Sequence, residues 1–498
     1  MTFYVTTPIY YVNAAPHLGH AYTTIAADVM ARHHRQRGEE VFFLTGTDEH
    51  GEPVADAAHA LGVEPQQLAD RNAERFKALA PQIGASNDFF IRTTDREHEA
   101  SVQEVLARVR DNGFVREGTY EGWYCPRCAD FKAESEIDPG NRCPIHHIEL
   151  TREQEENYFF ELSAFQQRLQ TLYAEREDFV MPRTRYNEAL SFIRSGLRDV
   201  PLTRHKLSWG VRVPWDPEHV FYVWFDALLN YYTALSYARA EDLTGEFWPA
   251  TYHLIGKDIL RFHAVYWPAL LMAAELELPR HVFVHGYLMM EGEKMSKSLG
   301  NVLDPFAVIE RFGADALRFY VLREVPFGQD GSVSTASFEL RYETELANEL
   351  GNLASRTLAM IARYRDWQVP AGAPDPVLGA DFESLPERVS ALIGGAELTL
   401  ALDQIWQRVR RLNRYVEEQA PWRLAAEPQR GEDLDRVLRT LAEGLRSVTV
   451  LLWPYMPASM ERLLAALGAP DVSLASAHLG AGAIARVSPI EPLFPKAA

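Results

Sequence analysis

The sequence predicts an α/β protein in which a parallel sheet is split by an insertion and followed by an all-α bundle. Three observations predict this arrangement. Short apolar runs alternate with helical stretches before residue 110 and again after residue 217, which is typical of a parallel, Rossmann-like sheet. The segment between them is instead rich in cysteine, proline, glycine and aromatic residues. From about Ser337 onward, Leu, Ala, Arg and Glu recur at helical spacing and strand signals disappear.

Length, charge and cysteine content narrow the class of protein. The chain has 498 residues, enough for about three domains. Its 50 Lys and Arg against 69 Asp and Glu give a net charge of −19, so any nucleic acid must be held by local basic clusters. Three cysteines cannot build a disulfide framework, which favours a reducing, cytoplasmic location. We expect no membrane partner, because the start lacks a signal-peptide pattern and the apolar stretch 263–274 is too short to span.

The first half of the sheet is expected within residues 1–110. Residues 3–7 predict a buried strand, followed by a turn and a helix over 18–37 that Gly38 stops. Residues 41–44 predict a second strand, and another helix begins near Pro53. Ligands of such sheets bind beyond the carboxyl ends of the strands. Residues that directly follow these strands are therefore the first candidates for a site.

The rest of the chain divides into four parts. They are an inserted module over 111–217, the second half of the sheet over 218–290, a linking segment over 291–336 and the helical bundle over 337–498. In the second half we expect strands at 220–225, 252–255 and 281–284, with a helix over 258–274. The bundle is expected to be helical over 337–365, 389–418 and 434–467, with an irregular connection over 369–386.

Two polar motifs lie where such a sheet binds its ligand. Pro16-His17-Leu18-Gly19-His20 falls where the first strand turns into the first helix, and free backbone N–H groups there favour phosphate. The two imidazoles add donors, and Gly19 lets a flat ligand such as a nucleotide base approach the backbone. The second motif, Glu293 to Asn301, reads Glu-Lys-Met-Ser-Lys-Ser-Leu-Gly-Asn. Its two lysines can neutralise a polyphosphate, and the flanking glycines permit the loop to close.

This pair of motifs around a split sheet resembles the two signatures of class I aminoacyl-tRNA synthetases. The first is His-Leu-Gly-His where that family usually has His-Ile-Gly-His, and the second, Lys-Met-Ser-Lys-Ser, is unaltered. The resemblance implies ATP binding, with Mg²⁺ as the counterion of ATP. It assigns catalysis to His17, His20, Lys294 and Lys297, and ATP contacts to these four together with Gly19 and Ser298.

Five further segments narrow the resemblance to the methionyl-tRNA synthetase family, over nearly the whole chain. They are residues 8–13, 46–51, 222–227, 255–259 and 419–422. The resemblance places methionine among Ile9, Tyr11, Trp224, Ala227, Tyr231, Ile259, His263 and Trp267, with Asp48 on its ammonium group. Aromatic walls suit a polarizable thioether, and a buried carboxylate suits an α-ammonium. For Tyr231, His263 and Trp267, which lie on predicted helices, packing in the core is the alternative.

The cysteines predict a metal site in the insertion. Cys125 and Cys128 are followed, after 14 residues, by Cys143 and His146, so that paired ligands stand at two-residue gaps. Four protein ligands fill a tetrahedral shell and leave no position for water. We therefore expect one structural Zn²⁺ per chain. His147 is an adjacent alternative to His146 as the fourth ligand.

The bundle carries a pattern suited to single-stranded RNA. Asn348, Asn352 and Arg356 recur at intervals of four on one predicted helical face, and Trp422 stands at the end of another helix. Unpaired bases stack on aromatic rings and are read at their edges by Asn or Arg. These four positions resemble the family's anticodon reader, which recognises CAU. A helix cap and a core tryptophan are the alternative.

The resemblance implies a two-step reaction with methionine, ATP and tRNA in one site. The methionine carboxylate attacks the α-phosphorus of ATP, and the terminal adenosine hydroxyl of tRNA then takes the methionyl group. The histidines stabilise phosphate oxygens and the lysines the departing pyrophosphate. Lys257 and Asp258 are expected to help hold substrates, and Arg204 matches a family arginine near the site.

Three alternatives remain open at this point. A sibling enzyme for isoleucine, valine or leucine usually carries a large editing insertion, and the insertion here is only about a hundred residues, partly occupied by the zinc segment. A non-catalytic tRNA-binding protein could keep the fold, and a nucleotidyltransferase could make adenylates without tRNA. The chain ends without the dimerising appendage of some family members, so we expect a monomer.

Overall fold

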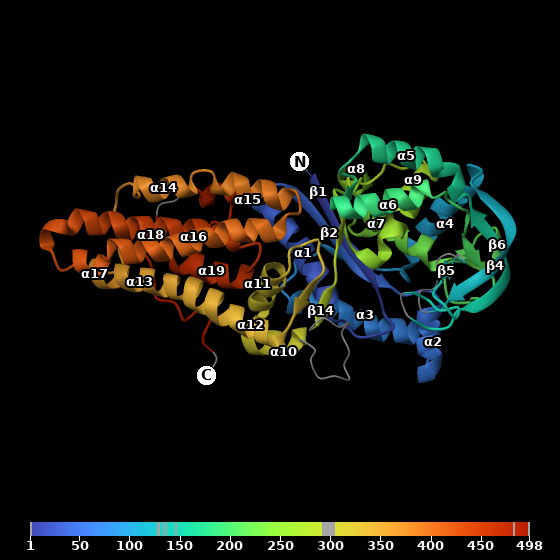
Figure 1. The fold of residues 1–498 in the computed structure, drawn as a ribbon, viewed down its shortest axis with the longest axis horizontal. Coiled ribbons are helices and arrows are strands. Elements are labelled where there is room, and N and C mark those ends of the chain that lie inside the picture. Colours follow the sequence, from blue (N-terminus) through green and yellow to red (C-terminus); the bar gives the residue numbers. More distant parts are fainter. Residues whose placement is uncertain are drawn as a thin grey trace.

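The computed structural model describes residues 2–126, 130–132, 134, 137–144, 147–290, 304–481 and 484–496. Figure 1 shows an elongated molecule with the helical bundle at one end, the insertion at the other and the large sheet between them. Within the described ranges, every helix is too short or too polar to serve as a membrane span.

A six-stranded sheet forms the centre of the molecule. Its order is β3-β2-β1-β12-β13-β7, and every neighbouring pair is parallel. The strands are β1 (Thr2–Tyr11), β2 (Glu40–Asp48), β3 (Phe89–Arg92), β12 (Tyr252–Gly256), β13 (His281–His285) and β7 (Val180–Met181). β1 pairs directly with β12, so the two expected halves meet in the middle. The edge strand β7 comes from within residues 111–217, which means that the insertion returns to the sheet.

Helices cover both faces of this sheet. They are α1 (Leu18–Gln36), α2 (Glu52–Leu61), α3 (Pro65–Gln82), α4 (Arg96–Asp111), α7 (Val223–Tyr237), α8 (Thr244–Phe247) and α9 (Trp267–Ala273). Successive side chains of β1 alternate between two cores, as the pleat requires. Phe3 and Val5 pack with α1 and with the helical bundle, whereas Tyr4 packs in the second core with α4 and α7. The bundle therefore shares a continuous core with one face of the sheet.

Two expected elements of the second half are corrected. The strand expected over 220–225 ends earlier, as β11 (Asp216–Phe221), and Tyr222 caps α7, which contains Val223 to Phe225. β11 also lies outside the large sheet, antiparallel to β9 (Thr203–Arg204) and β10 (Arg212–Val213). A short apolar run has the same appearance in a buried strand and in a buried helix, so periodicity could not separate them.

The single helix expected over 258–274 is also wrong. The chain forms a 3₁₀ turn at Lys257–Ile259, a π-helical turn at Phe262–Tyr266 and only then α9. Pro268 lies in the first turn of α9, where its missing N–H costs nothing. The wider π turn lies immediately before α9, and π turns of this kind are frequent at functional sites.

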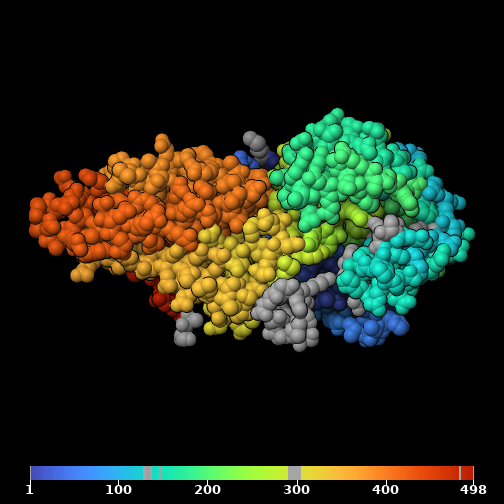
Figure 2. Space-filling view, viewed as in Figure 1, coloured from blue at the N-terminus to red at the C-terminus, as the bar shows by residue number. Residues whose placement is uncertain are grey.

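The insertion is built on a long antiparallel hairpin. Its sheet has the order β5-β4-β6-β8, and two helices follow it. The elements are β4 (Val115–Cys125), β5 (Asp130–Lys132), β6 (Thr151–Phe160), α5 (Gln166–Glu175), α6 (Arg183–Arg194) and β8 (Val200–Pro201). Figure 2 shows the surface hollowed where the cyan part of the insertion faces the dark-blue N-terminal residues.

The remaining chain is helical apart from one small parallel pair. β14 (Leu288–Met290) pairs with β15 (Gly331–Val333) before the bundle begins. The helices are α10 (Pro305–Phe312), α11 (Ala314–Glu324), α12 (Thr335–Arg341), α13 (Asn352–Arg365), α14 (Pro376–Phe382), α15 (Leu385–Gly394), α16 (Leu398–Gln419), α17 (Pro421–Leu424), α18 (Gly431–Leu452) and α19 (Pro457–Ala466). A π-helical segment, Tyr342–Gly351, joins α12 to α13. The connection expected to be irregular over 369–386 contains the short helix α14 and the start of α15.

A buried ion pair ties the bundle to the sheet. Arg318 on α11 donates to the Asp28 carboxylate on α1 at 2.7 Å, and both side chains are fully buried. The same guanidinium donates to the carbonyls of Pro454 and Tyr455, between α18 and α19, at 2.7 and 2.8 Å. Because α1 begins directly after β1, this pair joins the bundle to the helix on which the first motif lies.

Candidate active site

Three candidate segments meet at the carboxyl edge of the large sheet. His17 to His20 follow β1, Asp48 ends β2, and Lys257 follows β12. β1 and β12 are neighbours, and the chain leaves them toward opposite edges, through α1 to β2 and through α9 to β13. Such a reversal of strand order opens a crevice, and α/β sheets bind their ligands in that crevice.

The two histidines of the first motif are locked to the start of α1. The Gly19 N–H donates to Nδ1 of His17 at 3.0 Å, and the His17 N–H donates to Nδ1 of His20 at 3.1 Å. Because both Nδ1 atoms accept, each neutral ring carries its proton on Nε2. Burial, and then the neighbouring His17, hold the pKa of His20 well below its ordinary value. His20 therefore stays neutral at pH 7 and acts as an Nε2–H donor.

Neighbouring side chains fix the orientation of this pair. The His17 and His20 rings lie 3.7 Å apart between centroids, and the Tyr10 and Phe76 rings flank His20 at 4.6 and 5.1 Å. A Cβ atom on Gly19 would come within 2.9 Å of Cε1 of His17. A side chain at this position would therefore push the His17 ring out of its capping position, which adds a second reason for glycine beside the approach of a nucleotide base.

Asp48 presents a buried carboxylate without a full set of partners. Its side chain is 2% exposed, and Oδ1 has no hydrogen-bond partner in the described part of the chain. Burial, and next the nearby Asp226 carboxylate, hold the pKa of Asp48 well above its ordinary range. A cation placed against Oδ1 would supply the missing partner and reverse this shift. Asp48 is therefore suited to an ammonium group.

A buried histidine–aspartate–histidine chain lies behind Asp48. Asp226 accepts from Nδ1 of His50 at 2.6 Å and from Nε2 of His98 at 2.7 Å, and all three side chains are buried. Burial opposes charge on His50, but the Asp226 carboxylate raises the pKa of His50 to about 10. The two imidazoles lower the pKa of Asp226 to about 2 against the effect of burial. The sequence analysis assigns no role to these three side chains, although His50 and Asp226 lie in two of the segments that carry the family resemblance, 46–51 and 222–227.

Replacing Asp226 by asparagine tests this chain. Asp226→Asn is expected to cost about 3–5 kcal/mol of stability at pH 6, because it leaves a buried charge uncompensated. The pKa of His50 lies above its unfolded value, so the stabilisation is complete below pH of about 6.5 and is lost as the pH rises toward about 10. Urea midpoints of wild type and variant should therefore differ less at pH 9 than at pH 6. An equal difference at both pH values would contradict the assignment.

An aromatic wall stands beside Asp48. The Trp224 indole stacks on Phe262, with ring centroids 3.7 Å apart, and Tyr11 meets Trp224 edge-on at 6.1 Å. Nε1 of Trp224 is buried and has no partner among the described residues. The partly buried Ile9 and Ile259 pack against the same core. These side chains form an apolar surface with an unused N–H donor.

The other expected methionine-binding residues are buried behind that wall. The Tyr231 hydroxyl donates to Nε2 of His263 at 2.8 Å, and Nδ1 of His263 donates to the Ile259 carbonyl at 3.0 Å. Burial lowers the pKa of His263 to about 4, so its ring is neutral. Ala227 is also buried, and Trp267, fully buried, donates to His253 at 3.2 Å.

The remaining polar candidates are engaged in ion pairs or exposed. Lys257 pairs with Asp330 at 2.6 Å and lies over the Tyr287 ring, while Asp258 is exposed. Arg204 is buried and donates from Nε to Glu155 at 2.9 Å, which joins β9 to β6. Lys294, Lys297 and Ser298 lie outside the described residues.

Half of the expected metal site lies within the described residues. Cys125 and Cys143 are both fully buried and belong to one small cluster with Leu150. The alternative ligand His147 is 74% exposed, unlike the two buried cysteines, and its Nδ1 lies 3.7 Å from the Asp138 carboxylate. Cys128 and His146 fall outside the described ranges, and no group of three metal ligands occurs within those ranges.

The expected RNA-reading residues lie on the π-helical segment, on α13 and on the short helix α17. Arg356 on α13 pairs with Glu417 on α16 at 2.7 Å, five residues before Trp422, which is 43% exposed. Asn352 is also exposed. Asn348 is exposed too, but it belongs to the π-helical segment, so the interval of four that predicted a regular α-helical face does not hold there.

Comparisons with known proteins place the chain in a family. A family profile described as tRNA synthetases class I (M) matches residues 3–155 and 141–358. The methionine–tRNA ligase of Caldanaerobacter subterraneus subsp. tengcongensis is 44% identical over 99% of this chain and 79% of its own length. The methionine–tRNA ligase of Rhizobium meliloti is 46% identical over 99% of this chain and 98% of its own length.

Solved structures agree. The methionyl-tRNA synthetase of Mycobacterium tuberculosis in complex with methionyl-adenylate superposes with a TM-score of 0.96 at 42% identity, over 99% of both chains. The apo form of that enzyme gives a TM-score of 0.89 at 39% identity, over all of this chain and 98% of the other. With sequence similarity and fold both extending over nearly the full length, the chain belongs to the methionyl-tRNA synthetase family of class I tRNA synthetases.

Proposed function

We propose that this protein attaches methionine to tRNA at the expense of ATP, through a methionyl-adenylate intermediate. Family membership at 44–46% identity over 99% of the chain supports the reaction. The observation that carries the amino-acid part is the buried Asp48 carboxylate, one oxygen of which has no partner among the described residues, beside the apolar wall of Tyr11 and Trp224. A zwitterion with a flexible, polarizable side chain matches both features.

In the first step the methionine carboxylate attacks the α-phosphorus of ATP, and the bond to the β-phosphate oxygen breaks to release pyrophosphate. The Nε2–H groups of His17 and His20, at the start of α1, would donate to phosphate oxygens, and His20 would do so as a neutral ring. Lys294 and Lys297 would neutralise the leaving pyrophosphate, with Mg²⁺ entering as the counterion of ATP. Such a step needs positioning and charge stabilisation rather than a covalent nucleophile.

In the second step the terminal adenosine hydroxyl of tRNA attacks the methionyl carbonyl carbon, and AMP leaves. The bundle would hold the anticodon, which we propose to be CAU, through Asn348, Asn352, Arg356 and Trp422. The exposed Trp422 ring offers a stacking surface, and the Arg356–Glu417 pair holds Arg356 against the last turns of α16, just before the short helix α17 that carries Trp422.

Charging tests this proposal directly. Purified protein, ATP and tRNA are incubated separately with labelled methionine, isoleucine, leucine or valine, and label in acid-precipitable tRNA is counted. We expect label from methionine alone. Charging with another amino acid would show that the protein is a sibling synthetase. Pyrophosphate exchange without charging would show that it is a nucleotidyltransferase. Absence of both reactions would indicate a non-catalytic tRNA-binding protein.

We also propose a structural Zn²⁺ in the insertion, held by Cys125, Cys128, Cys143 and His146. The two described cysteines support it, because two fully buried thiols gather in one small cluster with little other core. Metal analysis should give one zinc per chain, falling to near zero in Cys125→Ser. The His147→Ala variant should retain its zinc. A full zinc content in Cys125→Ser would contradict the site.

A further inference from the structure

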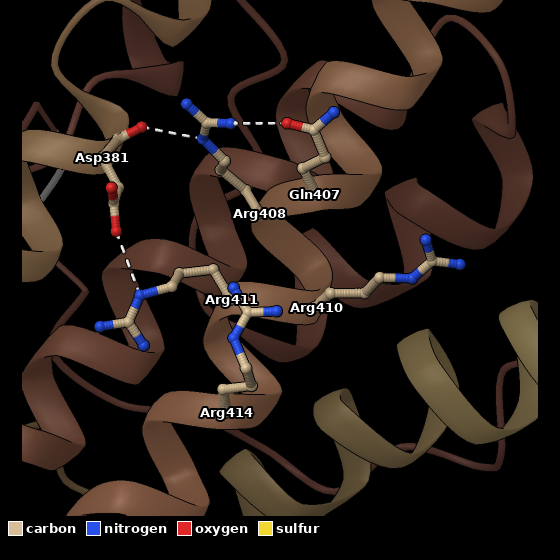
Figure 3. Close-up of a pocket in the computed structure, with 6 residues that line it drawn as sticks. All are labelled: Asp381, Gln407, Arg408, Arg410, Arg411 and Arg414. Carbon is tan, nitrogen blue, oxygen red and sulfur yellow. Dashed lines mark hydrogen bonds and ion pairs between the residues drawn. The ribbon is translucent and has the colours of Figure 1, made fainter.

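An arginine-rich pocket lies on the outer surface of the bundle, on α16. It is lined by Asp381, Gln407, Arg408, Arg410, Arg411 and Arg414, and encloses about 230 Å³. Figure 3 shows Arg408 and Arg411 turned toward Asp381 on α14, with Arg410 extended away from it. The pocket is thus lined by four arginines and one carboxylate residue, with the Arg410 guanidinium turned away from that carboxylate.

The positive charge of this pocket is incompletely compensated. Arg411 forms ion pairs with the carboxylates of Asp381 and Glu418, each at 3.1 Å. Arg408 donates to the Asp381 backbone carbonyl at 2.9 Å and to the Gln407 side-chain oxygen at 3.4 Å, both of them neutral acceptors. Burial, and then the nearby Arg388, lower the pKa of Arg408. Arg414 is exposed and has no ion pair in the described part of the chain.

Arg414 lies on the side of α16 that faces the segments carrying the expected anticodon-reading residues Asn348 and Arg356. Arg410, Arg414 and Glu417 follow one another at intervals of four and three, so they share one side of the helix. Arg410 pairs with Glu349 at 3.0 Å, next to Asn348. Glu417 pairs with Arg356 at 2.7 Å. Arg414 therefore stands between the two ion pairs that hold α16 against the π-helical segment and α13.

We propose that this pocket binds the phosphate backbone of the tRNA anticodon stem and loop, with Arg414 and Arg408 as its main contacts. The inference rests on the proposed function. Arginine forks match phosphate oxygens. Arg408 and Arg414 are six residues apart, about 9 Å along the helix axis, which suits an extended chain of phosphates better than a single anion. Because the protein carries a net charge of −19, such a local cation cluster is the expected means of holding RNA.

The test measures tRNA binding in Arg414→Ala and in the double variant Arg408→Gln with Arg414→Ala. Loss of one phosphate contact should raise the KM for tRNA about three- to tenfold and lower the slope of log affinity against log salt by about 0.7–0.9. Methionine-dependent pyrophosphate exchange should be unchanged, since no tRNA takes part. Arg414→Lys should recover most of the binding. Arg194→Ala, which removes another exposed arginine, on α6, is the matched control.

A second measurement separates backbone contact from base reading. With a tRNA whose anticodon is substituted, Arg414→Ala should weaken binding by the same factor as with CAU, because a phosphate contact carries no sequence information. A factor that depends on the anticodon would overturn the backbone assignment. An unchanged KM and salt slope in both variants, with wild-type charging intact, would overturn the inference while leaving the proposed function standing. A wild-type protein that fails to charge would instead count against the proposed function.

Discussion

Replacing Asp48 by asparagine is expected to reduce kcat/KM for methionine by about 150- to 5000-fold. The substitution keeps the shape of the side chain but removes the charge that pairs with the α-ammonium group. Breaking such a buried pair costs about 3–5 kcal/mol. The Oδ1 atom of Asp48 has no partner in the described part of the chain, so the cation of the substrate is the partner that the carboxylate lacks. Methionine-dependent pyrophosphate exchange, measured over a range of methionine concentrations, checks the result.

The matched control is Asp56→Asn. Asp56 lies on α2, eight residues further along the chain, and is exposed. The same chemical change there should leave the exchange rate within about twofold of wild type, as exposed substitutions away from a site usually do. A methionine KM that does not change in Asp48→Asn would remove the ammonium site from the proposed mechanism.

Replacing Lys297 by alanine is expected to slow pyrophosphate exchange by roughly 2–4 kcal/mol of barrier, or about 30- to 1000-fold. The ammonium group is proposed to contact the pyrophosphate as charge develops on it, and donors of this kind contribute most in the transition state. The loss should therefore appear in kcat, with little change in the KM for methionine. Lys294→Ala should behave similarly.

Lys77→Ala serves as the control, because Lys77 on α3 is exposed and lies outside both motifs. Exchange at the wild-type rate in Lys297→Ala would mean that the second motif does not contact the phosphates.

The same measurement on His20→Ala tests the first motif. We expect a loss of similar size there, since His20 is a neutral donor fixed by the His17 backbone.

Local signals predicted the first half of the fold well. The buried run at residues 3–7, the helix that ends before Gly38 and the second strand are all confirmed, although β1 and β2 are longer than expected. The expected strands at 252–255 and 281–284 are confirmed as well. Apolar runs bounded by glycine, proline or polar turns identify such elements because the signal lies within a few neighbouring residues.

Elements that depend on distant contacts were missed. Residues 223–225 are helical because the chain turns at Tyr222 into a helix that packs on the sheet, and an apolar run alone could not show this. The π turn at Phe262–Tyr266 and the two-residue strand β7 leave no periodic signal of their own. β7 exists because Val180 and Met181 find β13, about a hundred residues later in the chain.

The same distinction between local and distant signals applies to the candidate site. Motif position indicated His17 and His20, which stand where β1 gives way to α1, whereas the role of Asp48, the last residue of β2, rested on the family resemblance. Motif position could not indicate that His50, His98 and Asp226 form one buried chain, since their separations along the sequence are long and irregular. A signal did exist for two of them, because His50 and Asp226 lie in two of the segments that carry the family resemblance. His98 has no comparable signal.

The two-step reaction can be observed in a single experiment. The protein is incubated with ATP and labelled methionine without tRNA, freed of small molecules, and then mixed rapidly with tRNA. We predict that stoichiometric label first remains on the protein as methionyl-adenylate and then moves to the 3′ end of the tRNA within one turnover. If no label stays with the protein, or if it is not transferred when tRNA arrives, the central claim is contradicted.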